Sequence, residues 1–151
     1  MLEFKRTTSA STDFRELIKA LDKDLWDRYP NVQGEYTKHN SVEKIDTVIV
    51  GYLDGKPVAC GCFKEFNEES AEMKRIFVLH EQRGKGIAIA LMKELENWAK
   101  ELNYSNSVLE TGTLQVEAIP LYKKIGYSII PNYPPYEGME YSVCMKKPLT
   151  T

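Results

Sequence analysis

The spacing of apolar residues changes twice in the N-terminal quarter of the chain. Leu2 and Phe4 alternate with polar residues, a pattern typical of a short strand. Over 14–26 the apolar residues recur three and four positions apart, which predicts an amphipathic helix. From 28 to 41 no periodicity remains, and the proline, glycine and asparagine residues favour a loop or a short irregular helix. This segment either covers a site or only connects two elements.

The next part of the chain is rich in β-branched and aromatic residues. Two such runs, 46–53 and 58–66, flank Asp54-Gly55, a dipeptide that favours a tight turn between antiparallel strands. A third run at 71–79 follows a short charged connection. Together these patterns predict an antiparallel meander.

A helical pattern returns at Ile87 and continues to Leu102, with apolar residues on one face and charged residues largely on the other. A short strand centred on Val108 follows it. A further helix is expected over 114–125, and Pro120 within that range requires either a kink or a later start.

Two closing strands are expected at 127–130 and 141–145, with Gly126 ending the helix before them. The order of elements is then β, α, loop, β, β, β, α, β, α, β, β, which is a mixed α/β fold with one right-handed strand-helix-strand crossover. A chain of 151 residues has the size of one domain, so we expect 1–151 to form a single domain.

Composition narrows the classes of function. The 20 Lys and Arg residues oppose 22 Asp and Glu residues, which leaves a net charge of −2 and no basic footprint for nucleic-acid binding. The three cysteines, Cys60, Cys62 and Cys144, form no Cys-x-x-Cys pair, and the histidines match no zinc pattern. No segment resembles a signal peptide or a membrane span. We therefore expect a cytoplasmic protein without a structural metal, a membrane partner or a nucleic-acid partner.

Candidate chemistry begins at the segment 82–88, Gln-Arg-Gly-Lys-Gly-Ile-Ala, between the end of a strand and the start of the longest helix. Its two glycines permit compact or left-handed backbone, so several N–H groups can converge at the positive end of the helix. A diphosphate is the natural ligand of such a cradle, although glycines at a helix entrance also serve as simple turn residues. The segment does not match the P-loop, and it lacks the third glycine of the dinucleotide fingerprint.

At this segment the sequence resembles the GNAT superfamily of acetyl-CoA-dependent N-acetyltransferases. The family motif of Arg or Gln, two residues, Gly, one residue, and Gly or Ala is met by Arg83, Gly86 and Ala88. The downstream family pattern Leu-Tyr-x-x-x-Gly-Tyr is met by 121–127. The resemblance implies a twisted, mostly antiparallel sheet of about seven strands with one splayed parallel pair, flanked by about four helices.

The resemblance also implies how an acetyl donor binds. The pantetheine arm of acetyl-CoA would pair with main-chain groups at 76–78, along a strand edge that splaying leaves open. Backbone N–H groups at 83–88 would hold the pyrophosphate, and Gln115 takes the place of a family asparagine that contacts the arm. With acetyl-CoA as cosubstrate and no metal, the expected binding residues are Ile76, Phe77, Val78, Arg83, Gly84, Lys85, Gly86, Ile87, Ala88 and Gln115.

Acetyl transfer to an amine needs a base, because a free amine with a pKa of about 10 is mostly protonated at neutral pH, and it needs a proton for the departing thiolate. Glu72 is the first candidate base, since strict alternation along a strand places it on the face of Ile76. Glu110, on the opposing strand, is the competing base or an amine-binding carboxylate. Tyr122 resembles the family tyrosine that acts as general acid. Their ordinary alternatives are a surface glutamate, a turn-stabilising glutamate and a core aromatic residue.

The expected acceptor is the primary amine of a small molecule or amino-acid-like compound, attacking directly in a ternary complex. Tyr29, Tyr36 and His39 from the first irregular connection, with Tyr136 from the last, are the candidate substrate-binding residues. Three alternatives stay open: transfer to a protein lysine or N-terminus, a CoA-binding sensor without turnover, and nucleotide binding at the glycine segment. Assembly into a homodimer also stays open.

Overall fold

The computed structural model describes residues 1–28 and 44–149. These residues form a seven-stranded sheet in the order β1-β2-β3-β4-β5-β7-β6, which confirms the expected mixed α/β class. The strands are β1 (Leu2–Thr7), β2 (Val48–Leu53), β3 (Lys56–Asn67), β4 (Ser70–Val78), β5 (Asn106–Gly112), β6 (Ser128–Ile130) and β7 (Ser142–Pro148).

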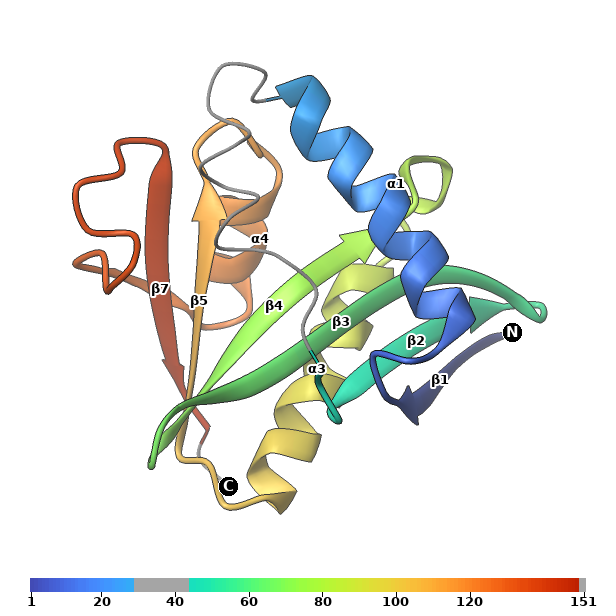
Figure 1. Ribbon diagram of the computed structural model, residues 1–151, viewed down its shortest axis with the longest axis horizontal. Coiled ribbons are helices and arrows are strands. Elements are labelled where there is room, and N and C mark those ends of the chain that lie inside the picture. The colour runs from blue at the N-terminus through green and yellow to red at the C-terminus, as the bar shows by residue number, and fades with distance from the viewer. Residues whose placement is uncertain (29–43, 150–151) are drawn as a thin grey trace.

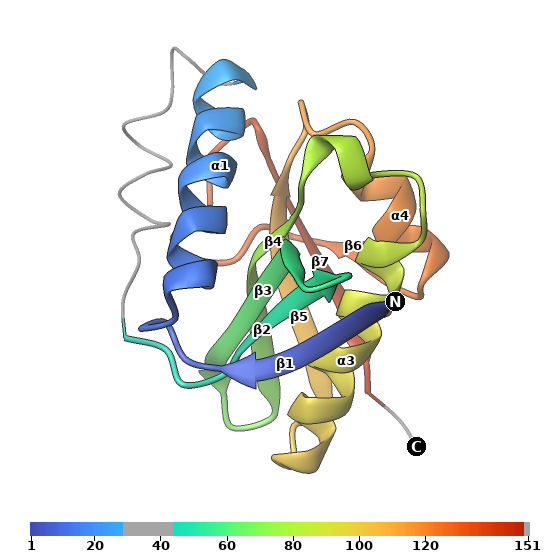
Figure 2. The same ribbon diagram turned by 90° about the vertical axis from the view of Figure 1, so that its right-hand side faces the viewer.

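Helices cover both faces of the sheet (Figure 1). Helix α1 (Thr12–Arg28) lies on one face, whereas α3 (Ile87–Glu101) and α4 (Ala118–Lys124) lie on the other, as the turned view in Figure 2 shows. The described residues thus contain three α-helices and one 3₁₀ turn, His80–Gln82, where the resemblance implied about four helices. None of the helices within 1–28 and 44–149 combines the length and apolar character that a membrane span requires.

The meander of β2, β3 and β4 follows the sequence prediction closely. Asp54 and Gly55 both have positive φ, 51° and 84°, as the tight turn of a two-residue hairpin requires. β3 then pairs antiparallel with both β2 and β4. Because both turn residues need positive φ, the Asp-Gly dipeptide was sufficient by itself to predict this hairpin.

The second half of the chain also agrees with the elements expected from its sequence. The structure decides between a kink at Pro120 and a later start of the helix. The helix expected over 114–125 starts late, at Ala118, so Pro120 falls in its first turn, where a missing N–H breaks no helical hydrogen bond. Gly126 follows the helix with φ 109°. The late start leaves residues 113–117 as a turn between β5 and α4.

The parallel strands β4 and β5 diverge in the middle of the sheet. Their pairing runs from Ser70 opposite Asn106 to Met73 opposite Leu109 and ends there, although both strands continue. Figure 1 shows the two arrows separating toward their carboxyl ends. Beyond Met73, one edge of β4 therefore faces a gap instead of a neighbouring strand, which matches the splayed pair that the resemblance implied.

A β-bulge in β4 changes which face its side chains occupy. Cys60 pairs with Phe77 and Cys62 pairs with Lys74, so two residues of β4 lie opposite one residue of β3. Arg75 in this bulge has φ 59°. Because the bulge shifts the alternation by one position, Met73 and Ile76 both pack in the core beneath α3, whereas Phe77 packs beneath α1.

The bulge corrects one expectation. Glu72 does not share a face with Ile76, because the bulge at Arg75 lies between them. Glu72 pairs across the sheet with Val108, whose core cluster holds Tyr133 and Tyr136 on the side of the sheet opposite α3. Strict alternation is valid only for an unbroken strand.

Candidate active site

A groove of about 420 Å³ runs along the open edge of β4; we call it the donor groove. Its walls are the end of β4, the first turn of α3, the α1 residues Leu21 and Asp24, and α4 with the turn before it. All the predicted cofactor-binding residues line it except Lys85, whose exposed ammonium donates to Gln82 Oε1 at 2.8 Å. The structure thus brings residues from 76 to 115 to one continuous surface.

The glycine segment forms an anion-binding end of α3. Gly84 and Gly86 have φ of 81° and 79°, and Gly86 is the N-cap residue of the helix. No side chain in the described part of the chain caps this helix, so the N–H groups of its first turn lack helical acceptors and carry the positive end of the helix dipole. A Cβ at either glycine would meet nothing within 4 Å, so backbone conformation calls for glycine here. The cradle fits a pyrophosphate.

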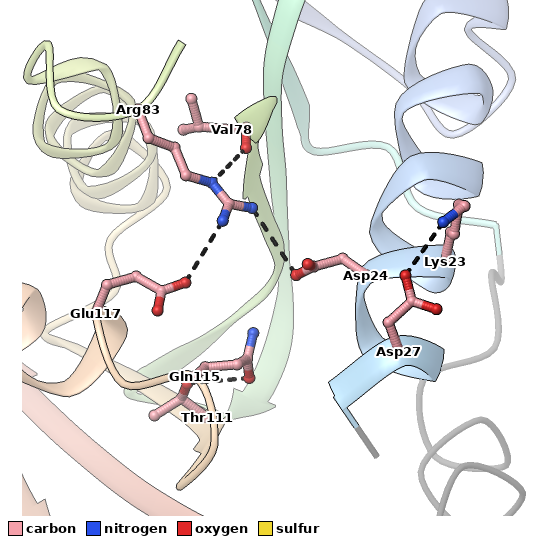
Figure 3. Close-up of polar contacts among 8 residues, drawn as sticks. All are labelled: Lys23, Asp24, Asp27, Val78, Arg83, Thr111, Gln115 and Glu117. Carbon is pink, nitrogen blue, oxygen red and sulfur yellow. Dashed lines mark hydrogen bonds and ion pairs between the residues drawn. The ribbon is translucent and has the colours of Figure 1, made fainter. Parts of the chain in front are cut away.

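The Arg83 side chain contacts three of the elements that line the donor groove (Figure 3). Its Nε donates to the Val78 carbonyl at 3.0 Å, Nη2 lies 3.8 Å from Asp24 of α1, and Nη1 lies 3.6 Å from Glu117 before α4. Sequence analysis did not find Asp24 or Glu117, because no local pattern reports pairs so distant along the chain. The guanidinium therefore acts mainly between protein groups, while the Arg83 backbone belongs to the cradle.

A second, smaller space of about 80 Å³ lies between the diverging ends of β4 and β5; we call it the inner cavity. It shares Leu21, Ile76, Gln115 and Tyr122 with the donor groove, so the two spaces meet. Gln115 Oε1 accepts from the Gly112 backbone N–H at 3.0 Å and from the Thr111 hydroxyl at 3.4 Å, and the second bond is drawn in Figure 3. These bonds fix the Gln115 amide at this junction.

The Glu110 carboxyl group of the inner cavity has a strongly shifted pKa. Burial raises its pKa from the ordinary 4.5 to about 7, against a hydrogen bond from Ser142 and the charge of Lys74, while the Glu72 carboxylate raises it further. Its Oε2 atom is shielded from solvent and has no hydrogen-bond partner among the described residues. Such a carboxyl group can take up and release a proton near neutral pH.

Glu72 lines the same cavity in a different environment. Glu72 is 6% exposed, and its carboxylate accepts a hydrogen bond from the Tyr133 hydroxyl at 3.1 Å. Lys74 lies beside it on the cavity wall, and burial lowers the pKa of its ammonium. The two carboxylates therefore differ in their partners, because Glu72 has a hydrogen-bond donor in place and Glu110 has an unpaired oxygen.

Tyr122 lies where the two spaces meet. Its side chain is 7% exposed, and burial, with the nearby charges of Glu110 and Glu117, raises its pKa. Tyr127 fixes it, since its backbone N–H donates to the Tyr122 carbonyl at 2.9 Å and the two rings pack edge to face at 5.8 Å. The hydroxyl therefore keeps its proton at neutral pH, as a proton donor must.

The predicted acceptor residues have different outcomes. Tyr136 is 1% exposed and lines the inner cavity. Tyr29, Tyr36 and His39 lie outside the described residues. On the α1 side the cavity is closed by Leu21 and Leu25, which the helical stripe marked as buried without indicating against what.

Two further observations concern residues near the bulge. The Arg75 side chain, 7% exposed, forms an ion pair with Asp22 of α1 at 2.8 Å, a contact that sequence analysis missed. Cys60 and Cys62 are buried, and their thiols donate to the Arg75 and Lys74 carbonyls at 3.5 and 3.3 Å. They line neither space, which suits the interpretation of these cysteines as buried small residues.

Comparisons with known proteins agree with this geometry. A profile described as the acetyltransferase (GNAT) family matches residues 13–127. The chain is 33% identical over 136 residues to an IAA acetyltransferase of Azospirillum brasilense, covering 89% of each chain. A solved structure from Klebsiella pneumoniae, named provisionally as an acyl-CoA N-acyltransferase, superimposes with a TM-score of 0.81 at 27% identity over 99% of both chains.

A more distant structure shares the fold alone. N-acetylglutamate synthase of Neisseria gonorrhoeae, solved with coenzyme A and N-acetyl-glutamate, has a TM-score of 0.74 at 16% identity and covers all of this chain but 36% of its own. The family match spans most of the sequence, and the fold and the glycine cradle agree with it. This protein is therefore an enzyme of the acetyltransferase (GNAT) family.

Proposed function

We propose that the protein transfers an acetyl group from acetyl-CoA to the primary amine of a small or amino-acid-like molecule, by direct attack in a ternary complex. The observation that carries this proposal is the meeting of two spaces at Tyr122: a groove that ends in an anion-binding helix terminus, and a cavity that holds a carboxyl group with a pKa of about 7. Bound acetyl-CoA would supply the activated thioester carbonyl.

On the donor side, the chain provides main-chain groups more than side chains. The open edge of β4 at 76–78 offers backbone N–H and C=O groups, and the first turn of α3 offers N–H groups to a diphosphate. An N–H group of the same edge can stabilise negative charge developing on the carbonyl oxygen; loss of one such donor typically costs about 3 kcal/mol.

On the acceptor side, Glu110 is our choice of general base. Its carboxylate is available near neutral pH and its unpaired Oε2 can accept the proton of an ammonium group. Glu72 then acts as a second negative charge that attracts the cationic form of the amine. Tyr122, which holds its proton and lines the groove, would give that proton to the leaving sulfur.

The size of the inner cavity supports a compact acceptor group. A space of about 80 Å³ suits an amine on a narrow stem, and its lining combines the carboxylates Glu72 and Glu110 with Lys74, Arg75 and Tyr136. A lysine side chain also has such a stem, so a protein acceptor is an outcome that the experiment must distinguish.

The test measures thiol release from acetyl-CoA against amines, polyamines, free amino acids and lysine peptides. We expect turnover with at least one small amine and weaker turnover with peptides. Binding of coenzyme A without turnover across the whole panel would instead support a sensor. Displacement of coenzyme A by ATP or NAD at comparable affinity would support nucleotide binding.

A further inference from the structure

Gly61 of β3 lies outside both functional spaces. Because it has no side chain, it leaves room for the end of Ile76, a residue that lines both spaces. A Cβ built at Gly61 would lie 2.7 Å from Ile76 Cδ1 and 2.8 Å from Leu95 Cδ1, closer than real carbon atoms approach. Gly61 is buried, and its φ is not positive, so close approach and not backbone conformation calls for glycine here. The end of the Ile76 side chain thus occupies the notch that the glycine leaves.

The β4 bulge explains why the notch is needed. Gly61 stands between Cys60 and Cys62, directly opposite the two bulged residues. The bulge turns Ile76 onto the α3 face, which is also the face of Gly61, because both cysteines lie on the α1 face. Two side chains would otherwise compete for the same place in the core.

A side chain at position 61 would displace Ile76 in one direction. Leu91 and Leu95 behind it are 0% exposed and packed within the main core, so that side offers no space. Ile76 lines both the donor groove and the inner cavity, which are the open spaces beside it. Because a crowded side chain moves toward the nearest void, Ile76 would move into the place where the two spaces meet.

We propose that Gly61 is a positioning residue of the acyl-donor site: it keeps Ile76 withdrawn from the junction of the groove and the cavity, and so sets the width available to an acyl-CoA. The inference rests on the proposed function in that the donor groove takes a coenzyme A thioester. It adds a residue on a neighbouring strand that controls the binding of the donor without touching it.

The test is calorimetric titration with coenzyme A, together with steady-state kinetics in acetyl-CoA, on Gly61→Ala. We expect the Kd for coenzyme A and the KM for acetyl-CoA to rise about tenfold, as overpacking of this kind permits. The double variant Gly61→Ala/Ile76→Val removes Cδ1, the contacting atom of Ile76. The close contact with Leu95 Cδ1 at 2.8 Å remains in both Gly61→Ala proteins, so recovery of affinity toward that of Ile76→Val measured alone assigns the effect to Ile76.

Gly51→Ala is the matched control. It also places a methyl group in a buried strand position, 2.9 Å from Phe4 Cε1, but on β2, where it faces the edge strand β1 and lies outside both spaces. It should melt earlier than the wild type, with coenzyme A affinity unchanged. If Gly61→Ala does not fold, recovery of folding in Gly61→Ala/Ile76→Val carries the test, and a double variant that also fails to fold would overturn the inference.

Three further outcomes would overturn the inference. Unchanged coenzyme A affinity in folded Gly61→Ala would do so, as would a loss that Ile76→Val does not relieve. An equal loss in Gly51→Ala would show that general destabilisation explains the effect. Wild-type protein that binds no coenzyme A would refute the proposed function, and the inference with it, whereas the first three outcomes leave the proposed function intact.

Discussion

Replacing Glu110 with glutamine should have opposite effects on catalysis and on stability, because the buried, ionised carboxylate lowers the stability of the folded protein. Burial raises its pKa from 4.5 to about 7, so the folded state binds the proton more tightly than the unfolded chain does. Wild-type protein therefore loses stability as the pH rises from about 4.5 to about 7, and then levels off. A shift of this size corresponds to roughly 3 kcal/mol at the plateau.

The amide of the Glu110→Gln variant has no proton to lose, so the effects of the substitution on rate and stability have opposite signs. Loss of a general base costs about 10²-fold to 10⁴-fold in turnover. The difference in unfolding free energy between the variant and the wild type, measured by urea unfolding, should increase in favour of the variant by roughly 2 to 3 kcal/mol from pH 5 to pH 8. The wild-type rate should rise with pH to a plateau above about pH 7, and the variant should lack this rise.

Glu72→Gln is the matched control, since it changes the other carboxylate of the same cavity by the same atoms. It keeps an oxygen for the Tyr133 hydroxyl, so we expect a smaller loss of turnover. The rise of the rate with pH should be retained but shifted to lower pH, because the Glu72 charge that raises the pKa of Glu110 is removed. A Glu110→Gln enzyme with the wild-type pH-rate profile would refute the assignment of the base. A stability difference that does not change between pH 5 and pH 8 would refute the physical account of Glu110.

Three more substitutions test the remaining parts of the site. Tyr122→Phe should lower kcat about 10²-fold and leave coenzyme A affinity within about twofold, and unchanged kcat would remove the tyrosine from the mechanism. Gly86→Val places a β-branched residue at φ 79°, so coenzyme A binding by calorimetry should weaken at least about tenfold; normal binding by a folded variant would contradict the cradle. Arg83→Met removes the hydrogen bond to Val78 and two long ion pairs, so we expect a loss of about 1 kcal/mol in unfolding free energy, and no loss would show that the link between α1 and α4 contributes nothing.

The sequence by itself determined the features that depend on local chemistry. Asp54-Gly55 specified a hairpin because both residues tolerate positive φ, and the helical period marked α1 and α3 because one face of each is apolar. Gly84 and Gly86 marked the cradle for the same backbone reason. The order of strands and helices followed from these elements, and the family resemblance from the motif that contains the glycines.

Only the tertiary structure decided what each buried residue meets. Periodicity shows that a side chain is buried, but the bulge at Arg75 depends on pairing with β3, and it moved Glu72 off the face of Ile76. The pKa of Glu110 depends on burial between diverging strands and on charges of β4, none of which is encoded next to it. Such contacts join residues far apart in the chain, so their energies enter only when the whole sheet has formed.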